Sequence, residues 1–261
     1  MVLVYIFGAL LGLCFGSFLN VLIYRVPNGM NIATPPSHCP NCDYMLKWYD
    51  NIPVLSYIIL GGKCRNCKTH ISFRYTAVEI INTLLWVACI YVFWGTSIPL
   101  ACFCACACSI LLCMFCTDLE TRTVPDSFQI ALALFAVGVT VFDKSVAWYS
   151  HLIGAAVFGI VFWVVAFFVG KKVGQEALGG GDIKLAAAAG LLLGWEKMLA
   201  AMLVSTVAGS VIILIIRRAK KNGKTAEYPF VPFMAVGILI MLFFGDSLID
   251  LYMNIIYSFL P

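Results

Sequence analysis

Long apolar runs separated by short polar segments dominate this chain. A membrane-spanning helix needs about 20 mostly apolar residues, and eight segments approach that length, the sixth being short and rich in Ala and Leu. The pattern predicts an all-α polytopic membrane protein with about eight transmembrane helices. The eight segments are residues 2–24, 77–94, 98–116, 128–142, 151–169, 183–195, 198–216 and 230–244.

The composition agrees with this prediction and leaves no room for a large soluble domain. Hydrophobic residues make up 62% of the 261 residues and charged residues 11%, whereas soluble domains carry about 45–50% and 25%. No basic residue or obvious cleavage site marks residues 2–24 as a signal peptide, so we expect 1–24 to be a retained first helix. Residues 25–75 form the longest polar segment and are predicted to be a loop, and residues 76–261 a transmembrane core.

Positive charges determine the expected orientation. Lys and Arg gather on the cytoplasmic side of membrane proteins. With the first terminus outside, all of the 17 lysines and arginines except Lys144 and Lys197 become cytoplasmic. The same orientation places Asp118 and Asp182 at the cytoplasmic membrane face, although neither carboxylate was used to choose it.

The polar loop contains two Cys-x-x-Cys pairs, Cys39 with Cys42 and Cys64 with Cys67. This spacing is typical of a tetrahedral zinc site with four thiolate ligands. Two disulfides or reactive thiols are the alternatives, and a reducing cytoplasm disfavours disulfides. Four sulfur ligands leave no open position for water, so we expect a structural zinc ion. The other eight cysteines are interpreted as small buried hydrophobic residues.

Asp118 and Asp182 each lie at the edge of a long apolar run. Carboxylates next to lipid are costly and therefore indicate function. Two carboxyl groups that share one proton can act as base and acid towards water in aspartyl proteolysis. The glycines before Asp182, Gly179, Gly180 and Gly181, are expected to interrupt a helix and let the backbone approach a substrate strand.

Each acid has a structural alternative when it is taken alone. Asp182 starts a predicted helix and could only cap it, and Asp126 follows Pro125 at another helix start. Glu120 could be a solvated loop charge. Because Asp126 has this sufficient structural role, Asp118 is predicted to be the partner of Asp182.

These residues form motifs that resemble those of the type IV prepilin peptidases, the GxGD aspartyl proteases of pilus, competence and type II secretion systems. Gly179–Asp182 matches the GxGD motif, followed by Lys184, and Asp118 with Glu120 matches the first aspartate box. The similarity runs from the first span to near Phe233. Two positions depart from the pattern, Thr76 where proline is usual and Val231 where glycine is usual. Further matches are Gly16 to Arg25, both cysteine pairs, Trp48, Asp50 to Pro53, Ser56, Tyr57, Gly62, Lys63, Arg74, Tyr75, Glu79, Pro125 and Asp126.

The resemblance implies an activity, a substrate and cofactors. Asp118 and Asp182 are then catalytic, supported by the three glycines, Lys184 and Asp126. The substrate is a prepilin or pseudopilin whose basic leader ends in glycine, cut at the cytoplasmic face of a bacterial inner membrane. The cysteine loop, with Gly62 and Lys63, implies methylation of the new N-terminal amine by S-adenosylmethionine.

Partners follow from the same resemblance. We expect membrane lipid, pilus or secretion assembly machinery and no nucleic acid. Acidic residues at the cytoplasmic mouth suit a basic leader. These residues are Asp118, Glu120, Asp126, Glu176 and Asp182.

Two other functions remain open from the residues alone. An ion-coupled transporter would use Asp118 and Asp182 as proton relays, but it predicts carboxylates near the bilayer midplane rather than at one edge. A zinc-stabilised scaffold for a secretion machine would explain the cysteine loop and leave the glycine–aspartate box unexplained.

Overall fold

The computed structural model describes residues 1–173, 179–219 and 229–259, and Glu176 therefore lies outside the described residues. In the described part the chain is helical, with two isolated β-bridges and no strand. Contacts divide the chain into two units, Met1–Cys113 and Met114–Pro261. The elements in order are α1 (Val2–Arg25), η1 (Trp48–Asn51), α2 (Leu55–Ile59), α3 (Phe73–Phe93), α4 (Ile98–Thr121), α5 (Asp126–Phe142), α6 (Trp148–Val173), α7 (Gly180–Leu193), α8 (Trp195–Ala219) and α9 (Val231–Phe259).

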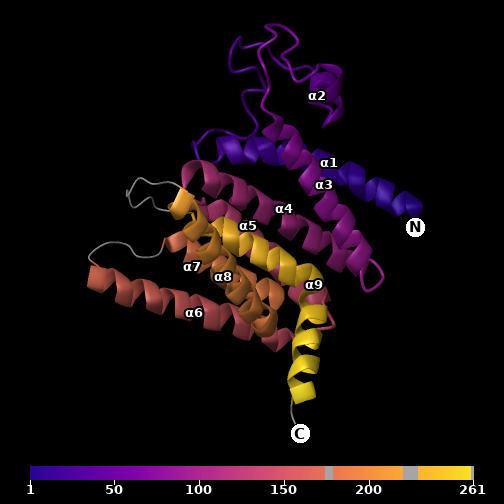
Figure 1. Cartoon of the computed structure of the whole chain (residues 1–261). Helices are drawn as coiled ribbons and strands as arrows, with labels where there is room; N and C mark the ends of the chain where they lie inside the picture. Colours follow the sequence, from indigo (N-terminus) through magenta and orange to yellow (C-terminus); the bar gives the residue numbers. More distant parts are fainter. Residues whose placement is uncertain (174–178, 220–228, 260–261) are drawn as a thin grey trace. The chain divides into compact units, whose positions relative to one another are not determined.

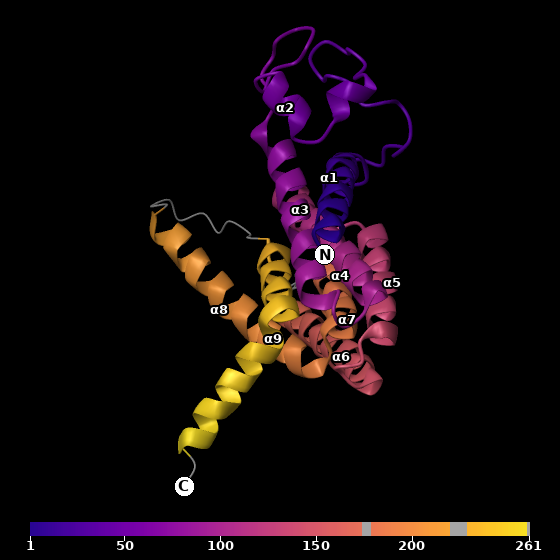
Figure 2. The same cartoon turned by 90° about the vertical axis from the view of Figure 1, so that its right-hand side faces the viewer.

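Each of the eight predicted segments coincides with one helix of this series, which confirms the all-α polytopic class. In the described ranges, six helices are long and apolar enough to cross a membrane: α1, α3, α4, α6, α8 and α9. The helices α5, with 17 residues, and α7, with 14, are shorter. Eight complete crossings are therefore not established. Helix α9 continues to Phe259 instead of ending near residue 244, and its last turns extend beyond the neighbouring helices of its unit (Figure 2).

In the first unit, α1 packs closely on α3 because glycines line the contact. A Cβ atom at Gly12 would lie 2.9 Å from Cα of Thr83, and one at Gly16 would lie 2.7 Å from Cα of Glu79. Small residues let membrane helices approach in this way. The Asn82 side chain donates to the Gly12 carbonyl at 2.8 Å, which adds a buried hydrogen bond between the two helices. The cysteine loop lies beyond the ends of α1 and α3 that it connects (Figure 2).

In the second unit, α7 is the central helix and contacts α5, α6, α8 and α9 (Figure 1). Gly154 of α6 faces Gly190 of α7 so closely that a Cβ atom on either would lie within 2.5 Å of the other's backbone. At the same end of α7, the Leu191 carbonyl accepts from Thr140 of α5 at 3.2 Å and lies 2.9 Å from Nδ1 of His151. These contacts fix the C-terminal end of α7 against α5 and α6.

Candidate active site and cysteine cluster

One of the two predicted catalytic acids lies at the C-terminal end of a helix, and the other lies at the N-terminal end of a different helix. Asp118 is in the last turn of α4, where it is 6% exposed. Arg122 follows that helix with φ of +55°, and its amide donates to the Asp118 carbonyl, so the chain turns away directly after the acid. Asp182 is in the first turn of α7. Both residues belong to the second unit.

The structure brings these two carboxylates together. The charge of Asp118 acts on the Asp182 carboxyl group. The backbone amide of Gly179 lies near the Asp182 carboxyl group and that of Val231 near the Asp118 carboxyl group. Among the described residues, Oδ2 of Asp118 is buried without a hydrogen-bond partner. A buried acceptor of this kind is available to a proton, a water molecule or a substrate group.

Asp126 has a different environment from the pair. It is the first residue of α5, directly after Pro125, and its carboxylate forms an ion pair with Lys184 of α7 at 2.5 Å. Both side chains are exposed. The structure therefore connects Asp126 with Lys184, two residues that the sequence analysis assigned separately to the support of the site.

The glycines before Asp182 do not form a break of their own. Gly179 caps α7, while Gly180 and Gly181 already belong to its first turn. The prediction that all three interrupt a helix is thus wrong for Gly180 and Gly181, because both are helical residues of α7. A Cβ atom at Gly180 would meet no atom of the described residues within 4 Å, so these residues leave one side of the turn open.

Sequence reasoning missed two buried polar residues beside these acids. Thr117, next to Asp118, is 0% exposed, and its hydroxyl has no partner in the described part of the chain. Gln129 of α5 is 4% exposed, and its Nε2 donates to the Gly181 carbonyl at 3.0 Å. Its position three residues after Asp126, on the same face of a helix, was the available signal.

In the first unit, the four loop cysteines form one cluster. Their sulfur atoms all lie within 4.8 Å of one another. The Sγ atoms of Cys39 and Cys67 are 3.8 Å apart, and those of Cys42 and Cys64 are 4.0 Å apart. Sulfurs bound tetrahedrally at about 2.3 Å from a metal ion would be separated by about 3.8 Å. The cluster could therefore hold a metal ion, and the disulfide alternative is not present since all four cysteines are free.

The two halves of the cluster repeat one local structure, which the sequence analysis did not find. A β-bridge closes each cysteine pair, His38 with Met45 and Lys63 with His70. The side-chain amide of Asn41 donates to the Cys67 sulfur at 3.6 Å, and that of the equivalent Asn66 donates to the Cys42 sulfur at 3.7 Å. The repeated Cys-x-Asn-Cys sequence was the signal. Reciprocal amide donors of this kind orient metal-binding sulfurs.

Polar groups near the cluster favour the charged forms of Cys67 and Asp50. Contacts with the Thr69 hydroxyl and backbone lower the pKa of Cys67 to about 5, which favours the thiolate. Burial raises the pKa of Asp50, but hydrogen bonds from Arg65 and from the Lys47 amide outweigh it and hold the pKa below its usual value. Asp50 is therefore ionised at neutral pH and anchors Arg65, which lies between the two cysteines of the second pair.

Gly62 and Lys63 precede this second pair. Gly62 has φ of +68°, and a Cβ atom there would lie 2.9 Å from the Tyr57 ring. Both the backbone conformation and the space restrict this position to glycine. Lys63 forms the bridge with His70, so the two residues are held by the same hairpin as Cys64.

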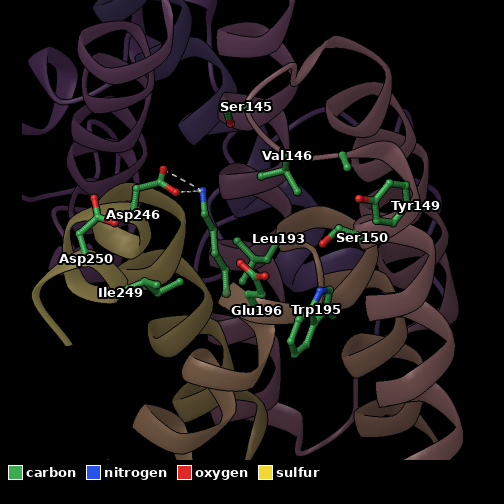
Figure 3. A pocket seen from close by; sticks show the side chains of 12 residues that line it. Ser145, Val146, Tyr149, Ser150, Leu193, Trp195, Glu196, Asp246, Ile249 and Asp250 are labelled. Carbon is green, nitrogen blue, oxygen red and sulfur yellow. Dashed lines mark hydrogen bonds and ion pairs between the residues drawn. The ribbon is translucent and has the colours of Figure 1, made fainter. Parts of the chain in front are cut away.

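The second unit also has an open pocket at the other end of α7, with a volume of about 330 Å³. Leu193 and Trp195 line it, roughly 17 Å along the helix from Asp182 by the rise per residue. Lys197 also lines it and forms an ion pair with Asp246 at 2.9 Å. Figure 3 shows Asp246 and Asp250 on one side of the pocket and Trp195 on the other. None of the predicted site residues lines this pocket, which separates it from the pair of acids.

A polytopic helical protein in which two interacting carboxylates lie at the ends of packed helices has the architecture of an intramembrane aspartyl protease. Two family models match the chain, the bacterial peptidase A24 N-terminal domain over residues 10–93 and the type IV leader peptidase family over residues 105–215. No solved structure matches it.

Curated relatives named prepilin leader peptidase/N-methyltransferase align with almost the whole chain. The relative from Burkholderia pseudomallei is 33% identical, over 92% of this chain and 85% of its own length. The relative from Myxococcus xanthus is 37% identical over 85% of this chain and 66% of its own length. The relative from Legionella pneumophila is 30% identical over 96% of this chain and 94% of its own length. The chain belongs to the type IV leader peptidase family, which confirms the resemblance read from its motifs.

Proposed function

We propose that this protein is a membrane-embedded aspartyl endopeptidase that removes the basic leader of type IV prepilin-like proteins after a glycine. It then methylates the new N-terminal amine with S-adenosylmethionine. The observation that carries the proposal is the pair of Asp118 and Asp182, two interacting carboxylates in a member of the type IV leader peptidase family.

The pair supports a one-proton mechanism. Two close carboxylates cannot both ionise easily, so one is ionised and the other protonated. The ionised acid takes a proton from water while the water oxygen attacks the carbonyl carbon of the scissile peptide bond. A proton then passes to the amide nitrogen and the C–N bond breaks. The products are a leader that ends in a carboxyl group and a mature chain with a free amine.

Substrate access and leader recognition follow from the neighbouring groups. The open side of the α7 turn at Gly180 leaves room for a substrate backbone beside Asp182. Glu120 and Asp126 lie near the same helix ends and give the entrance acidic groups that suit a basic leader. Lys184 holds Asp126 in place across α5 and α7.

The cysteine loop is assigned to the second activity. The ion it holds is zinc, bound by Cys39, Cys42, Cys64 and Cys67, because four thiolates at this spacing are its preferred structural ligands. With four ligands the ion orders the loop and does not contact the substrate. S-adenosylmethionine supplies a methyl group to the amine produced by cleavage. Residues 25–75, including Gly62 and Lys63, form this methylation-associated part, residues 1–24 the first transmembrane helix and residues 76–261 the protease core.

The location follows from the charge distribution. All lysines and arginines except Lys144 and Lys197 are cytoplasmic when the first terminus lies outside. The acids and the cysteine loop then face the cytoplasm of a bacterium from its inner membrane. The substrates are prepilins or pseudopilins presented from the lipid bilayer, and the products pass to pilus or secretion assembly machinery, without a nucleic-acid partner.

Reconstitution tests the proposal. Purified protein in proteoliposomes should release the leader from a prepilin peptide, and with S-adenosylmethionine the mature peptide should gain one methyl group, both measured by mass spectrometry. Proton uptake without leader release would support a transporter. Neither activity, together with intact zinc, would leave a zinc-stabilised scaffold as the better assignment.

A further inference from the structure

Gln129 connects α5 with the turn of α7 that carries Asp182. It is 4% exposed, and its Nε2 donates to the Gly181 carbonyl at 3.0 Å. A carbonyl oxygen only accepts, so the nitrogen of the amide must face it. The amide oxygen is then buried without a partner among the described residues.

This arrangement is not explained by packing alone. A methionine would fill much the same space without leaving a buried acceptor unpaired, which is unfavourable in a protein interior. What the amide adds is direction, because its hydrogen bond to the Gly181 carbonyl holds one side of a peptide group whose N–H donates to the Gly179 carbonyl at 3.0 Å. Gly181 directly precedes Asp182, so this peptide group includes the Asp182 nitrogen.

The first turn of a helix needs such a restraint more than the rest. Its amides lack intrahelical partners, and it is the part of a helix that frays most easily. In α7 this turn also contains Gly180 and Gly181, which lack side chains to hold it. Among the described residues, two polar side-chain contacts anchor the turn to α5: the hydrogen bond of Gln129 and the ion pair of Lys184 with Asp126.

We propose that Gln129 is a positioning residue of the peptidase site, which acts by holding the Asp182 turn of α7 in the orientation that cleavage requires. The inference rests on the proposed function, since it assigns a role relative to Asp182 in leader cleavage. Gln129 itself does not touch the reacting atoms in this assignment.

Thr140 provides a matched control in the same pair of helices. Its hydroxyl shares its hydrogen between the Ala136 carbonyl of α5 at 3.0 Å and the Leu191 carbonyl of α7 at 3.2 Å, so α5 contacts α7 through a side-chain hydrogen bond at each end. Leu191 lies nine residues beyond Asp182, far from the acids. Thr140→Val therefore removes an α5–α7 bond of the same kind without disturbing the turn that carries Asp182.

The test compares the kinetics of leader release by Gln129→Met, Thr140→Val and the unchanged protein in proteoliposomes. Gln129→Met should lower kcat by roughly tenfold or more with KM within about twofold, because a misplaced catalytic group slows the chemical step. Thr140→Val should keep kcat within about twofold, even if it lowers the melting temperature as much as Gln129→Met does. Equal kcat in the two variants would overturn the inference.

Gln129→Glu keeps the test decisive if the methionine variant folds poorly. A carboxyl group can donate to the Gly181 carbonyl only when it is protonated, so the kcat of this variant relative to the unchanged protein should rise as the pH is lowered. The charged groups near this position are Asp126, Asp182 and Lys184 of α5 and α7, together with Asp118 of α4, whose charge acts on Asp182. A constant ratio across the pH range would contradict the inference. Failure of the unchanged protein to release leader would instead contradict the proposed function.

Discussion

At the scale of single residues, Asp118 and Asp126 have different surroundings and are therefore expected to have different roles. Asp118 is buried at the end of α4, one of its oxygens has no partner among the described residues, and its charge acts on Asp182. Asp126 is exposed and already engaged with Lys184. An acid that must exchange protons with water and substrate needs the first environment, whereas the second suits a structural ion pair.

We therefore expect Asp118→Asn and Asp182→Asn each to lower the rate of leader release by at least 10²–10⁴-fold, on the order of a general acid–base contribution. Asp126→Asn should lower it by less than about tenfold, because an exposed ion pair contributes at most about 1 kcal/mol. Single-turnover cleavage of a prepilin peptide measures the rates, with circular dichroism as the check on folding. Near-normal cleavage by Asp118→Asn, combined with none by folded Asp126→Asn, would reverse the assignment.

At the scale of elements, the contact of α6 with α7 depends on two facing glycines. A Cβ atom at Gly190 would lie 2.4 Å from the carbonyl oxygen of Gly154, and backbone cannot yield as a flexible side chain can. At Gly159, also on α6, the nearest atom would be the Ala187 Cβ at 3.2 Å. Gly190 therefore represents a contact between two backbones, and Gly159 represents a contact with a side chain, between the same two helices.

Gly190→Ala should destabilise the protein by about 1–3 kcal/mol through overpacking, and Gly159→Ala by less than about 1 kcal/mol. Thermal unfolding of the detergent-solubilised protein measures both. If the two variants unfolded at the same temperature, the close approach of α6 and α7 at Gly154 would be incorrect.

The cysteine loop and the acids belong to different units of the chain, since the cluster lies in Met1–Cys113 and both acids lie in Met114–Pro261. Replacing Cys39 and Cys42 together by serine should remove bound zinc and methyl transfer while leaving much of the leader cleavage. Metal analysis and mass spectrometry of the peptide products measure these outcomes. Cys102→Ser, at an exposed cysteine outside the cluster, is the control and should keep both activities. Complete loss of cleavage in the folded double variant would place the loop in the protease site.

At the scale of the whole molecule, the charge distribution predicts one orientation in the membrane. A cysteine introduced at Asn28, exposed in the loop that follows α1, should be protected from a membrane-impermeant thiol reagent in intact cells. One introduced at Ser145, next to Lys144, should react, after subtraction of the labelling of the unchanged protein. Labelling of residue 28 from outside would invert the topology and remove the shared cytoplasmic site.

Much of this architecture was determined by the sequence itself. A bilayer demands long apolar segments with all backbone groups bonded within the helix, so hydrophobic runs alone predicted the helices. The cysteine pairs at Cys39 and Cys64 predicted one cluster, because knuckles of this kind are local structures with fixed spacing. The positions of Asp118 and Asp182 at helix ends followed from the same runs.

Only the tertiary structure decided which side chains meet across helices. Asp126 engages Lys184, Gln129 bonds Gly181, and Gly154 faces Gly190, although each pair is separated by more than 30 residues. Hydrophobic periodicity tells which face of a helix is buried but not which helix covers it. Those choices depend on how small residues let particular helices approach, and this is a property of the packed bundle rather than of any single segment.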